Sequence, residues 1–229
     1  MTVQAEPITF ASNGSMTPGY LARPADDNTH PAIVVIQEYW GLVPHIEEVT
    51  RRFAENEFIA LAPDLYYGRG AEEPDEARKL AMALDRRRAV AEILAAARYL
   101  AALPAVQPAA TGLVGWCMGG GLALSAAAED AAGLIGAAVA FYGRPLSADD
   151  VARLSVPVLA LYGGADHGIP VHEVEAFEEA LAQHRIVHQV KIYRDAPHAF
   201  FNDTRNSYRP EAARDAWRRT IEWFRTYLK

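Results

Sequence analysis

The amino-acid sequence predicts an α/β protein built on a doubly wound, mostly parallel sheet with helices on both faces. Three observations support this. Apolar runs without polar alternation, such as residues 32–36, are typical of parallel strands covered on both faces. Helical patterns separate these runs, and strands that alternate with helices form a parallel sheet. With 229 residues the chain is long enough for one such domain, which we expect to span residues 1–229.

The elements are predicted in chain order. Two β-prone pieces flank Ser12-Asn13-Gly14-Ser15 and predict an N-terminal hairpin at the sheet edge. The long helical stretch after Pro74 is expected to break near Leu84-Asp85, where Asp85 would cap a second helix. Buried strands are predicted at 32–36, 58–62, 113–114, 137–142, 156–162 and 187–193. Helices are predicted at 46–57, 74–103, 119–128, 171–184 and 211–228, the last with Ala213, Trp217, Thr220, Ile221 and Phe224 on its inner face.

Composition narrows the classes of partner and compartment. The net charge of −7 argues against nucleic acid or an anionic membrane as partner, and the run Arg86-Arg87-Arg88 is expected on a solvated face. One cysteine excludes a disulfide framework and a cysteine-based zinc site, and a lone thiol suits a reducing compartment. The first six residues lack the pattern of a signal peptide, and no apolar run approaches the roughly 18 residues of a membrane span. We therefore expect a cytoplasmic protein, without metal or cofactor.

The motif with the clearest chemistry is Gly115-Trp116-Cys117-Met118-Gly119, between an apolar run and an Ala-rich run. This is the strand–turn–helix pattern of a nucleophile elbow, with Cys where Ser is more usual. The glycines are needed because a β-carbon at either position would collide with neighbouring backbone. The helix N-terminus would favour a thiolate at Cys117. The alternative is a buried structural cysteine beside a tight turn.

Four polar or reactive residues fall at predicted strand ends: Glu38, Cys117, Asp166 and His198. In a doubly wound sheet, ligands bind beyond the carboxyl ends of the strands. The order Cys117, Asp166, His198 is the nucleophile–acid–base order of hydrolases with an elbow. Asp166 alone could be a turn or cap residue. His167 and His172 are local alternatives to His198, but neither follows the last strand.

Acid–base chemistry suggests a role for each group. His198 would take the thiol proton of Cys117, and Asp166 would fix the imidazole tautomer. The backbone N–H groups of Met118 and Tyr39 would form the oxyanion hole. Glu38 lies between an apolar strand and two aromatic residues, so burial should raise its pKa. It would either modulate the thiol or bond to a loop.

Together these residues resemble the dienelactone hydrolase (carboxymethylenebutenolidase) family of the α/β-hydrolase superfamily. The resemblance covers nearly the whole chain. It implies the α/β-hydrolase fold, a triad of Cys117, His198 and Asp166, and a resting contact of Glu38 with the thiol. It also implies enol-lactone substrates whose carboxylate is held by arginines. The motifs are Gln37-Glu38-Tyr39-Trp40-Gly41, Ala62-Pro63-Asp64-Leu65-Tyr66, Gly115-Trp116-Cys117-Met118-Gly119-Gly120, Tyr142-Gly143, Gly163-Gly164-Ala165-Asp166 and His198-Ala199-Phe200.

The substrate-binding positions depart from the family pattern. The family's arginine four residues past the catalytic histidine falls on Asn202, and an amide cannot supply a guanidinium's charge. The family's other arginine has no secure counterpart. The candidate substrate-binding residues are Arg69, Arg78, Tyr142 and Asn202, with Arg144 and Arg205 as further possible arginines.

Three hypotheses follow. The first is a cysteine hydrolase of small esters or lactones, with dienelactone-like substrates first. The second is a promiscuous carboxylesterase of uncharged esters, suggested by Asn202. The third is a fold relative that binds a small ligand without turnover, or an interaction module. We expect a monomer or a homodimer in each case.

Overall fold

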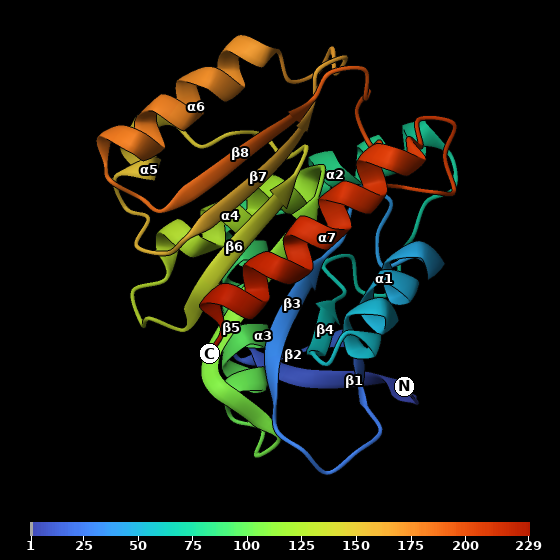
Figure 1. Ribbon diagram of the computed structural model, residues 1–229. Helices are drawn as coiled ribbons and strands as arrows, with labels where there is room; N and C mark the ends of the chain where they lie inside the picture. The colour runs from blue at the N-terminus through green and yellow to red at the C-terminus, as the bar shows by residue number, and fades with distance from the viewer. Residues whose placement is uncertain (1) are drawn as a thin grey trace.

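The computed structural model describes residues 2–229. Its eight strands form one sheet in the order β1-β2-β4-β3-β5-β6-β7-β8 (Figure 1). β1 pairs antiparallel with β2, and β2 with β4, while all other pairs are parallel. The predicted hairpin at the sheet edge is therefore confirmed. The strands are β1 (Val3–Ser12), β2 (Ser15–Pro24), β3 (His30–Ile36), β4 (Ile59–Pro63), β5 (Val106–Trp116), β6 (Ile135–Phe141), β7 (Val158–Gly163) and β8 (His188–Tyr193).

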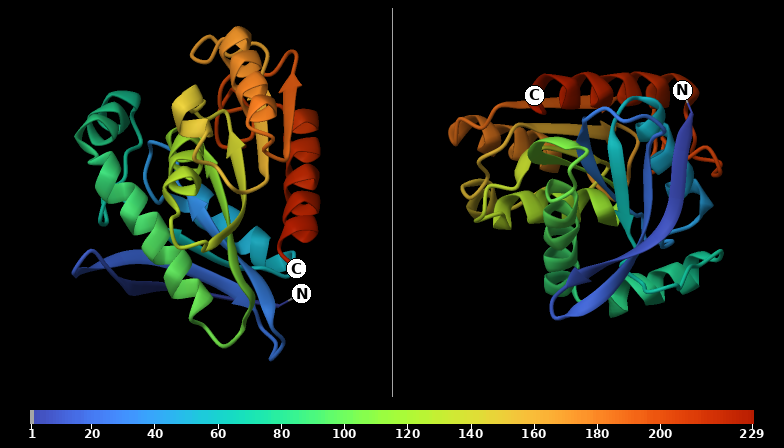
Figure 2. Two further views of the ribbon diagram at one scale, coloured as in Figure 1. Left: turned by 90° about the vertical axis from the view of Figure 1, so that its left-hand side faces the viewer. Right: turned by 90° about the horizontal axis from the view of Figure 1, so that it is seen from below.

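Helices cover both faces of the sheet, as the doubly wound prediction requires. Two buried clusters lie on opposite faces, one packed against α1 and α7 and the other against α3, α4 and α6. Figure 2 shows α3 and α7 on opposite sides of the strands. The helices are α1 (Pro44–Glu55), α2 (Pro74–Ala83), α3 (Arg86–Ala101), α4 (Met118–Glu129), α5 (Ala148–Val151), α6 (Val171–Gln183) and α7 (Pro210–Tyr227).

The predicted break in the long helical stretch is also confirmed. The side chain of Asp85 accepts hydrogen bonds from the backbone N–H groups of Arg87 at 3.0 Å and Arg88 at 3.1 Å. These bonds satisfy donors that the first turn of α3 leaves free. Two local predictions were inaccurate, since strand β5 begins well before residue 113 and the four-residue helix α5 was not foreseen. The predicted inner face of α7 is confirmed, because Ala213, Thr220, Ile221 and Phe224 are buried and Trp217 packs against the same cluster.

Aromatic packing fixes α1 and α7 on their face of the sheet. Phe53 of α1 is fully buried, and its ring lies 4.6 Å from that of Trp217 and 6.2 Å from those of Phe58 and Phe224. Such ring pairs add stability beyond the apolar area they bury. This layer packs against β3, β4, β5, β6 and β7, and the candidate site lies beyond the carboxyl ends of strands in the same sheet.

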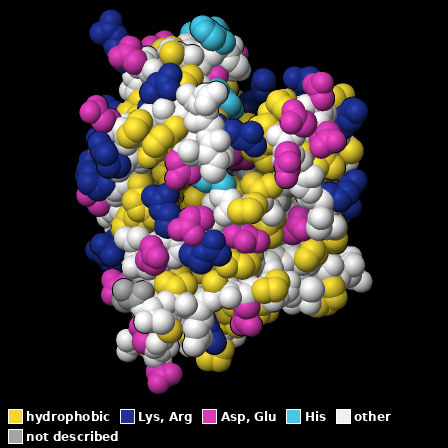
Figure 3. Space-filling model, turned by 90° about the vertical axis from the view of Figure 1, so that its right-hand side faces the viewer, with side chains coloured by type: hydrophobic (Ala, Val, Ile, Leu, Met, Phe, Trp, Pro, Cys, Tyr) yellow, Lys and Arg dark blue, Asp and Glu magenta, His cyan; other side chains and the backbone are white. Residues whose placement is uncertain are grey.

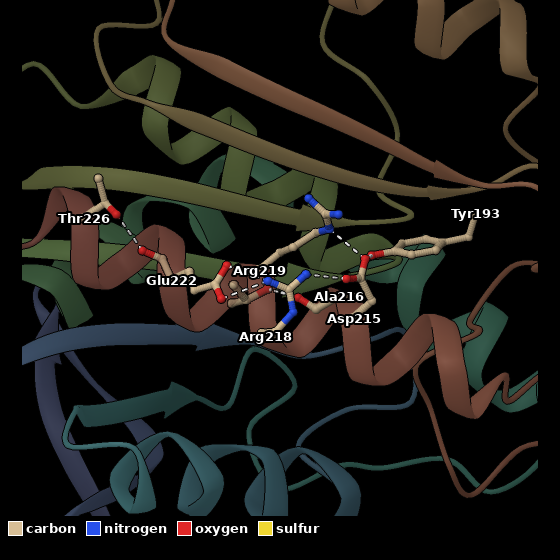
Figure 4. A network of polar contacts seen from close by, with 8 residues as sticks. Tyr193, Asp215, Ala216, Arg218, Arg219, Glu222 and Thr226 are labelled. Atoms are coloured by element: carbon tan, nitrogen blue, oxygen red, sulfur yellow. Dashed lines mark hydrogen bonds and ion pairs between the residues drawn. The ribbon is translucent and has the colours of Figure 1, made fainter.

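A polar network joins the N-terminal half of α7 to the edge strand β8 (Figure 4). Asp215 accepts hydrogen bonds from Tyr193 at 2.9 Å and from Arg218 and Arg219 at 2.6 Å each. Partial burial would raise the pKa of Asp215, but these bonds outweigh it and lower the pKa to about 2. The network fixes α7 against the strand that precedes His198.

The surface mixes charges of both signs. On the face shown in Figure 3, acidic and basic side chains alternate over short distances among apolar ones. Among residues 2–229, none of the helices combines the length and the apolar character that a membrane crossing needs. Over the same range, no three His, Cys, Asp or Glu side chains are grouped to hold a metal ion.

Candidate active site

Cys117 lies in a strained turn between β5 and α4. Its backbone has φ 54° and ψ −117°, a conformation that non-glycine residues rarely adopt and that is typical of functional sites. The N–H of Cys117 donates to the carbonyl of Phe141 at 3.0 Å, which ties the turn to β6. The turn places the thiol at the N-terminus of a 12-residue helix, as the elbow motif predicts.

The glycines of the elbow allow three backbones to meet. A β-carbon on Gly115 would lie 2.1 Å from the carbonyl oxygen of Gly119. One on Gly119 would lie 2.4 Å from the carbonyl oxygens of Ile36 and Gln37. Both distances are far below a normal contact, so neither position tolerates a side chain. The first turn of α4 is thereby held against β5 and against the end of β3.

Asp166 and His198 lie side by side, as the sequence predicts for an acid and a base of a triad. His198 Nδ1 lies 2.6 Å from Asp166 Oδ2, and Asp166 is 6% exposed. The other oxygen, Oδ1, accepts from the N–H groups of Gly168 at 2.8 Å and Ile169 at 3.2 Å. Burial would raise the pKa of Asp166, but its hydrogen bonds outweigh this and lower the pKa. The carboxylate therefore stays ionised and faces the imidazole.

The imidazole and the thiol interact in the same cavity. Burial would lower the pKa of His198, but hydrogen bonding and charge interaction with Asp166 and Cys117 outweigh it and raise the pKa to about 10. The cavity has a volume of about 310 Å³. Its walls are formed by Tyr39, Ala81, Arg86, Cys117, Met118, Gly121, Tyr142, Arg144, Gly168, Ile169 and His198.

The two residues predicted to form an oxyanion hole both line this cavity. Met118 is the first residue of α4, so its N–H has no partner within the helix. Within residues 2–229, the Tyr39 N–H donates to no protein group. Tyr66 supports both residues from the loop after β4, with its hydroxyl 3.3 Å from the Tyr39 carbonyl oxygen and 3.5 Å from Met118 Sδ. Its role was not predicted, although it lies in a family motif.

Glu38 lies outside the cavity wall and is only 2% exposed. Its Oε1 accepts from the Tyr142 hydroxyl at 3.3 Å and its Oε2 from the side-chain amide of Asn202 at 2.6 Å. The implied contact with the thiol of Cys117 is not among its hydrogen bonds within the described chain. Burial raises the pKa of Glu38, and the hydrogen bond from Asn202 and the charge of His198 oppose this shift.

The predicted substrate-binding residues occupy different places. Tyr142 lines the cavity, whereas Asn202 is 1% exposed and turned toward Glu38. Arg69 and Arg78 are exposed outside the cavity wall, Arg69 donating to the Tyr66 carbonyl and Arg78 pairing with Asp75. The guanidinium of Arg205 lies over the ring of Trp40, 3.6 Å from its centroid.

Two other arginines line the cavity with the thiol. Arg144 follows β6, and Arg86 is the first residue of α3. Within residues 2–229, neither forms an ion pair. The solvated face expected for Arg86-Arg87-Arg88 is confirmed, since all three are exposed, and Arg86 in addition lines the cavity.

Comparison with known proteins agrees with this architecture. A sequence profile of the Dienelactone hydrolase family matches residues 17–228. A protein of Methylorubrum extorquens, provisionally assigned as a carboxymethylenebutenolidase, is 36% identical over 235 residues, which cover 96% of this chain and 80% of the relative. A Bradyrhizobium protein, provisionally assigned as a 2-oxo-3-(5-oxofuran-2-ylidene)propanoate lactonase, is 32% identical over 241 residues, which cover 99% and 96%.

Solved structures extend the comparison to the fold. A crystal structure from Klebsiella pneumoniae, described provisionally as a dienelactone hydrolase, superimposes with a TM-score of 0.91 at 31% identity and covers 99% of this chain and 100% of that one. An acylaminoacyl peptidase of Pyrococcus horikoshii shares the fold alone, with a TM-score of 0.78 at 14% identity over 100% of this chain and 42% of that one. With its α/β-hydrolase fold and a family match along almost its entire length, this chain belongs to the dienelactone hydrolase family, whose members hydrolyse lactone and ester bonds.

Proposed function

We propose that this enzyme cleaves small esters or lactones by nucleophilic catalysis at Cys117, through a covalent acyl-enzyme. The observation that carries the proposal is the shared cavity of Cys117 and His198, with His198 held by Asp166 at 2.6 Å. A strained nucleophile, an orienting acid and a base, in this chain order, are the elements of a hydrolytic triad.

The reaction begins when His198 takes the thiol proton and the Cys117 sulfur attacks the carbonyl carbon. The N–H groups of Met118 and Tyr39 bind the resulting oxyanion. When the tetrahedral intermediate collapses, the carbon–oxygen bond to the leaving group breaks and His198 returns the proton to that oxygen. Water, deprotonated by His198, then attacks the thioester and releases the acid and the thiol.

Arg86 and Arg144 favour substrates that carry an anionic group near the scissile bond. Both cations line the cavity and lack an ion-pair partner among the described residues, so they are free to bind a carboxylate. The relative provisionally assigned as a lactonase is named for such a substrate, a propanoate. A carboxylesterase of uncharged esters is the second candidate, because Asn202 puts no positive charge beside Glu38.

The first test concerns the nucleophile. Hydrolysis of p-nitrophenyl acetate and of a dienelactone should disappear in Cys117→Ala, which removes only the thiol. Equal turnover by wild type and Cys117→Ala would overturn the mechanism.

The second test concerns the substrate class. In Arg86→Gln and Arg144→Gln, kcat/KM should fall roughly 10–100-fold for an ester with a free carboxylate. For its methylated counterpart kcat/KM should hardly change. Arg87→Gln is the matched control, because Arg87 lies on the same helix, is exposed and is not part of the cavity wall. Unchanged kcat/KM for both substrates would favour the second candidate, and equal losses for both would contradict a carboxylate-binding role.

A further inference from the structure

Glu38 is a buried carboxylate that the proposed reaction steps leave unused. Both of its oxygens are hydrogen-bonded to neutral groups, Oε1 to the Tyr142 hydroxyl at 3.3 Å and Oε2 to the Asn202 amide at 2.6 Å. No side chain in residues 2–229 forms an ion pair with it. A buried carboxylate without a cation is unusual, because desolvation favours its protonated form.

Thr204 fixes the orientation of the Asn202 amide. Asn202 Oδ1 accepts two hydrogen bonds from Thr204, one from its N–H at 3.0 Å and one from its hydroxyl at 2.6 Å. If the amide were flipped, its NH₂ group would face the Thr204 N–H donor, and its oxygen would face a carboxylate. Asn202 can therefore present only its N–H donors to Glu38.

The surroundings of Glu38 link it electrostatically to the catalytic base. The titratable or charged groups that face it are Tyr39, Tyr142, His198 and Arg205. Tyr142 contacts both the Glu38 carboxylate and the His198 imidazole, since its hydroxyl donates to Glu38 and its ring centroid is 5.1 Å from that of His198. The charge of His198 lowers the pKa of Glu38, so an ionised Glu38 in turn favours the imidazolium.

We propose that Asn202 is a positioning residue, locked by Thr204, that holds Glu38 beside Tyr142 and keeps it ionised, so that Glu38 acts as a second carboxylate that stabilises the His198 imidazolium. This inference rests on the proposed function, because the imidazolium forms when His198 takes the thiol proton. It assigns Asn202 to the support of the base instead of to the substrate.

The pH dependence of catalysis tests this role. Asn202→Leu removes the donor and keeps the branched shape of the side chain, so Glu38 should ionise only at higher pH. The acidic limb of kcat/KM for p-nitrophenyl acetate that reports the ionisation of Glu38 should therefore move up by about one to two pH units. The rate at the alkaline plateau should be largely kept. Thr204→Val, which removes one of the two bonds that lock the amide, should move the limb in the same direction by less.

Two controls separate this role from a structural one. Ser207→Ala removes a hydroxyl that donates to the Ala199 carbonyl at 3.1 Å in the same loop, and it should not move the limb. In a Glu38→Gln background, Asn202→Leu should cause no further shift, because the group that it acts on is absent. A profile of Asn202→Leu that superimposes on wild type, or an equal shift in the Glu38→Gln background, would overturn the proposal.

A measurement without turnover distinguishes failure of this inference from failure of the proposed function. The infrared band of the protonated Glu38 carboxyl, identified as the difference between wild type and Glu38→Gln, can be titrated in wild type and Thr204→Val. A midpoint that rises in Thr204→Val supports the positioning role even if Cys117→Ala proves fully active. An unchanged midpoint refutes it even if Cys117→Ala is inactive.

Discussion

Replacing Gly115 by Ala should damage both stability and catalysis, for a reason that the geometry makes quantitative. The added β-carbon would lie 2.1 Å from the Gly119 carbonyl oxygen and 2.8 Å from the Gly120 nitrogen, so one backbone must move by roughly 1 Å. The first turn of α4 cannot move away from Gly115, because Gly119 already lies against the end of β3. The movement must therefore shift the turn that carries Cys117.

Two magnitudes follow. Overpacking of this kind costs about 1–3 kcal/mol, occasionally more, and each kcal/mol lowers Tm by about 2–4 °C in a chain of this size. A misplacement of about 1 Å between reacting groups can lower the rate on the order of 100-fold. Gly115→Ala should thus lose several degrees in Tm and about two orders of magnitude in kcat/KM.

The assay compares thermal unfolding and p-nitrophenyl acetate hydrolysis in Gly115→Ala and Gly70→Ala. The control adds the same methyl group in a loop outside the cavity, where its nearest neighbours would be 3.5 and 3.6 Å away. We expect Gly70→Ala to be close to wild type in both measurements. A folded Gly115→Ala with wild-type Tm and wild-type kcat/KM would refute the steric reasoning.

Three further predictions test other parts of the structure. In Asp166→Asn the pKa of His198, about 10 in the wild type, should fall, and kcat should drop by roughly 10⁴-fold. NMR titration of the imidazole measures the first change and steady-state kinetics the second. An unchanged pKa of His198 would contradict its pairing with Asp166. The lowered pKa of Asp215 means that its ionised form stabilises the fold above about pH 4 and that this contribution is lost as the pH falls toward 2. Asp215→Asn should therefore lower stability by about 1 kcal/mol at pH 7, after solvent screening, and not at all near pH 2, as urea titrations at the two pH values would show. Phe53→Ala should cost about 3–5 kcal/mol of unfolding free energy, because the ring is fully buried among other aromatic rings; a loss below 1 kcal/mol would mean that α1 relaxes into the space.

Much of the fold and the central residues of the site could be predicted from local patterns. The uninterrupted apolar run before Gln37 predicts a doubly covered strand because solvent-facing positions are absent from it. The two glycines around Cys117 predict the elbow because only glycine fits where backbones meet. Asp166 and His198 follow because parallel strands bring their carboxyl ends to one edge of the sheet.

The sequence named Arg144 only as one of several possible arginines, and it did not single out Arg86 as a residue of the cavity wall. The direction of Arg86 depends on where α3 begins and on how that helix packs beside the loop of Arg144, 58 positions later in the numbering of the chain. Sequence spacing carries no information on such an approach. The presence of an arginine in the sequence also does not tell whether its guanidinium faces bulk water or a binding cavity.

The sequence by itself determined the class of sheet, the strained cysteine turn and the placing of Cys117, Asp166 and His198 at strand ends, because steric limits on glycine and the direction of parallel strands act locally. The tertiary structure alone decided that Asn202 faces Glu38, 164 positions away, and that Arg86 and Arg144 line the cavity. These contacts depend on the packing of separate loops, in which burial and hydrogen bonding select one side-chain direction from several that the local chain permits.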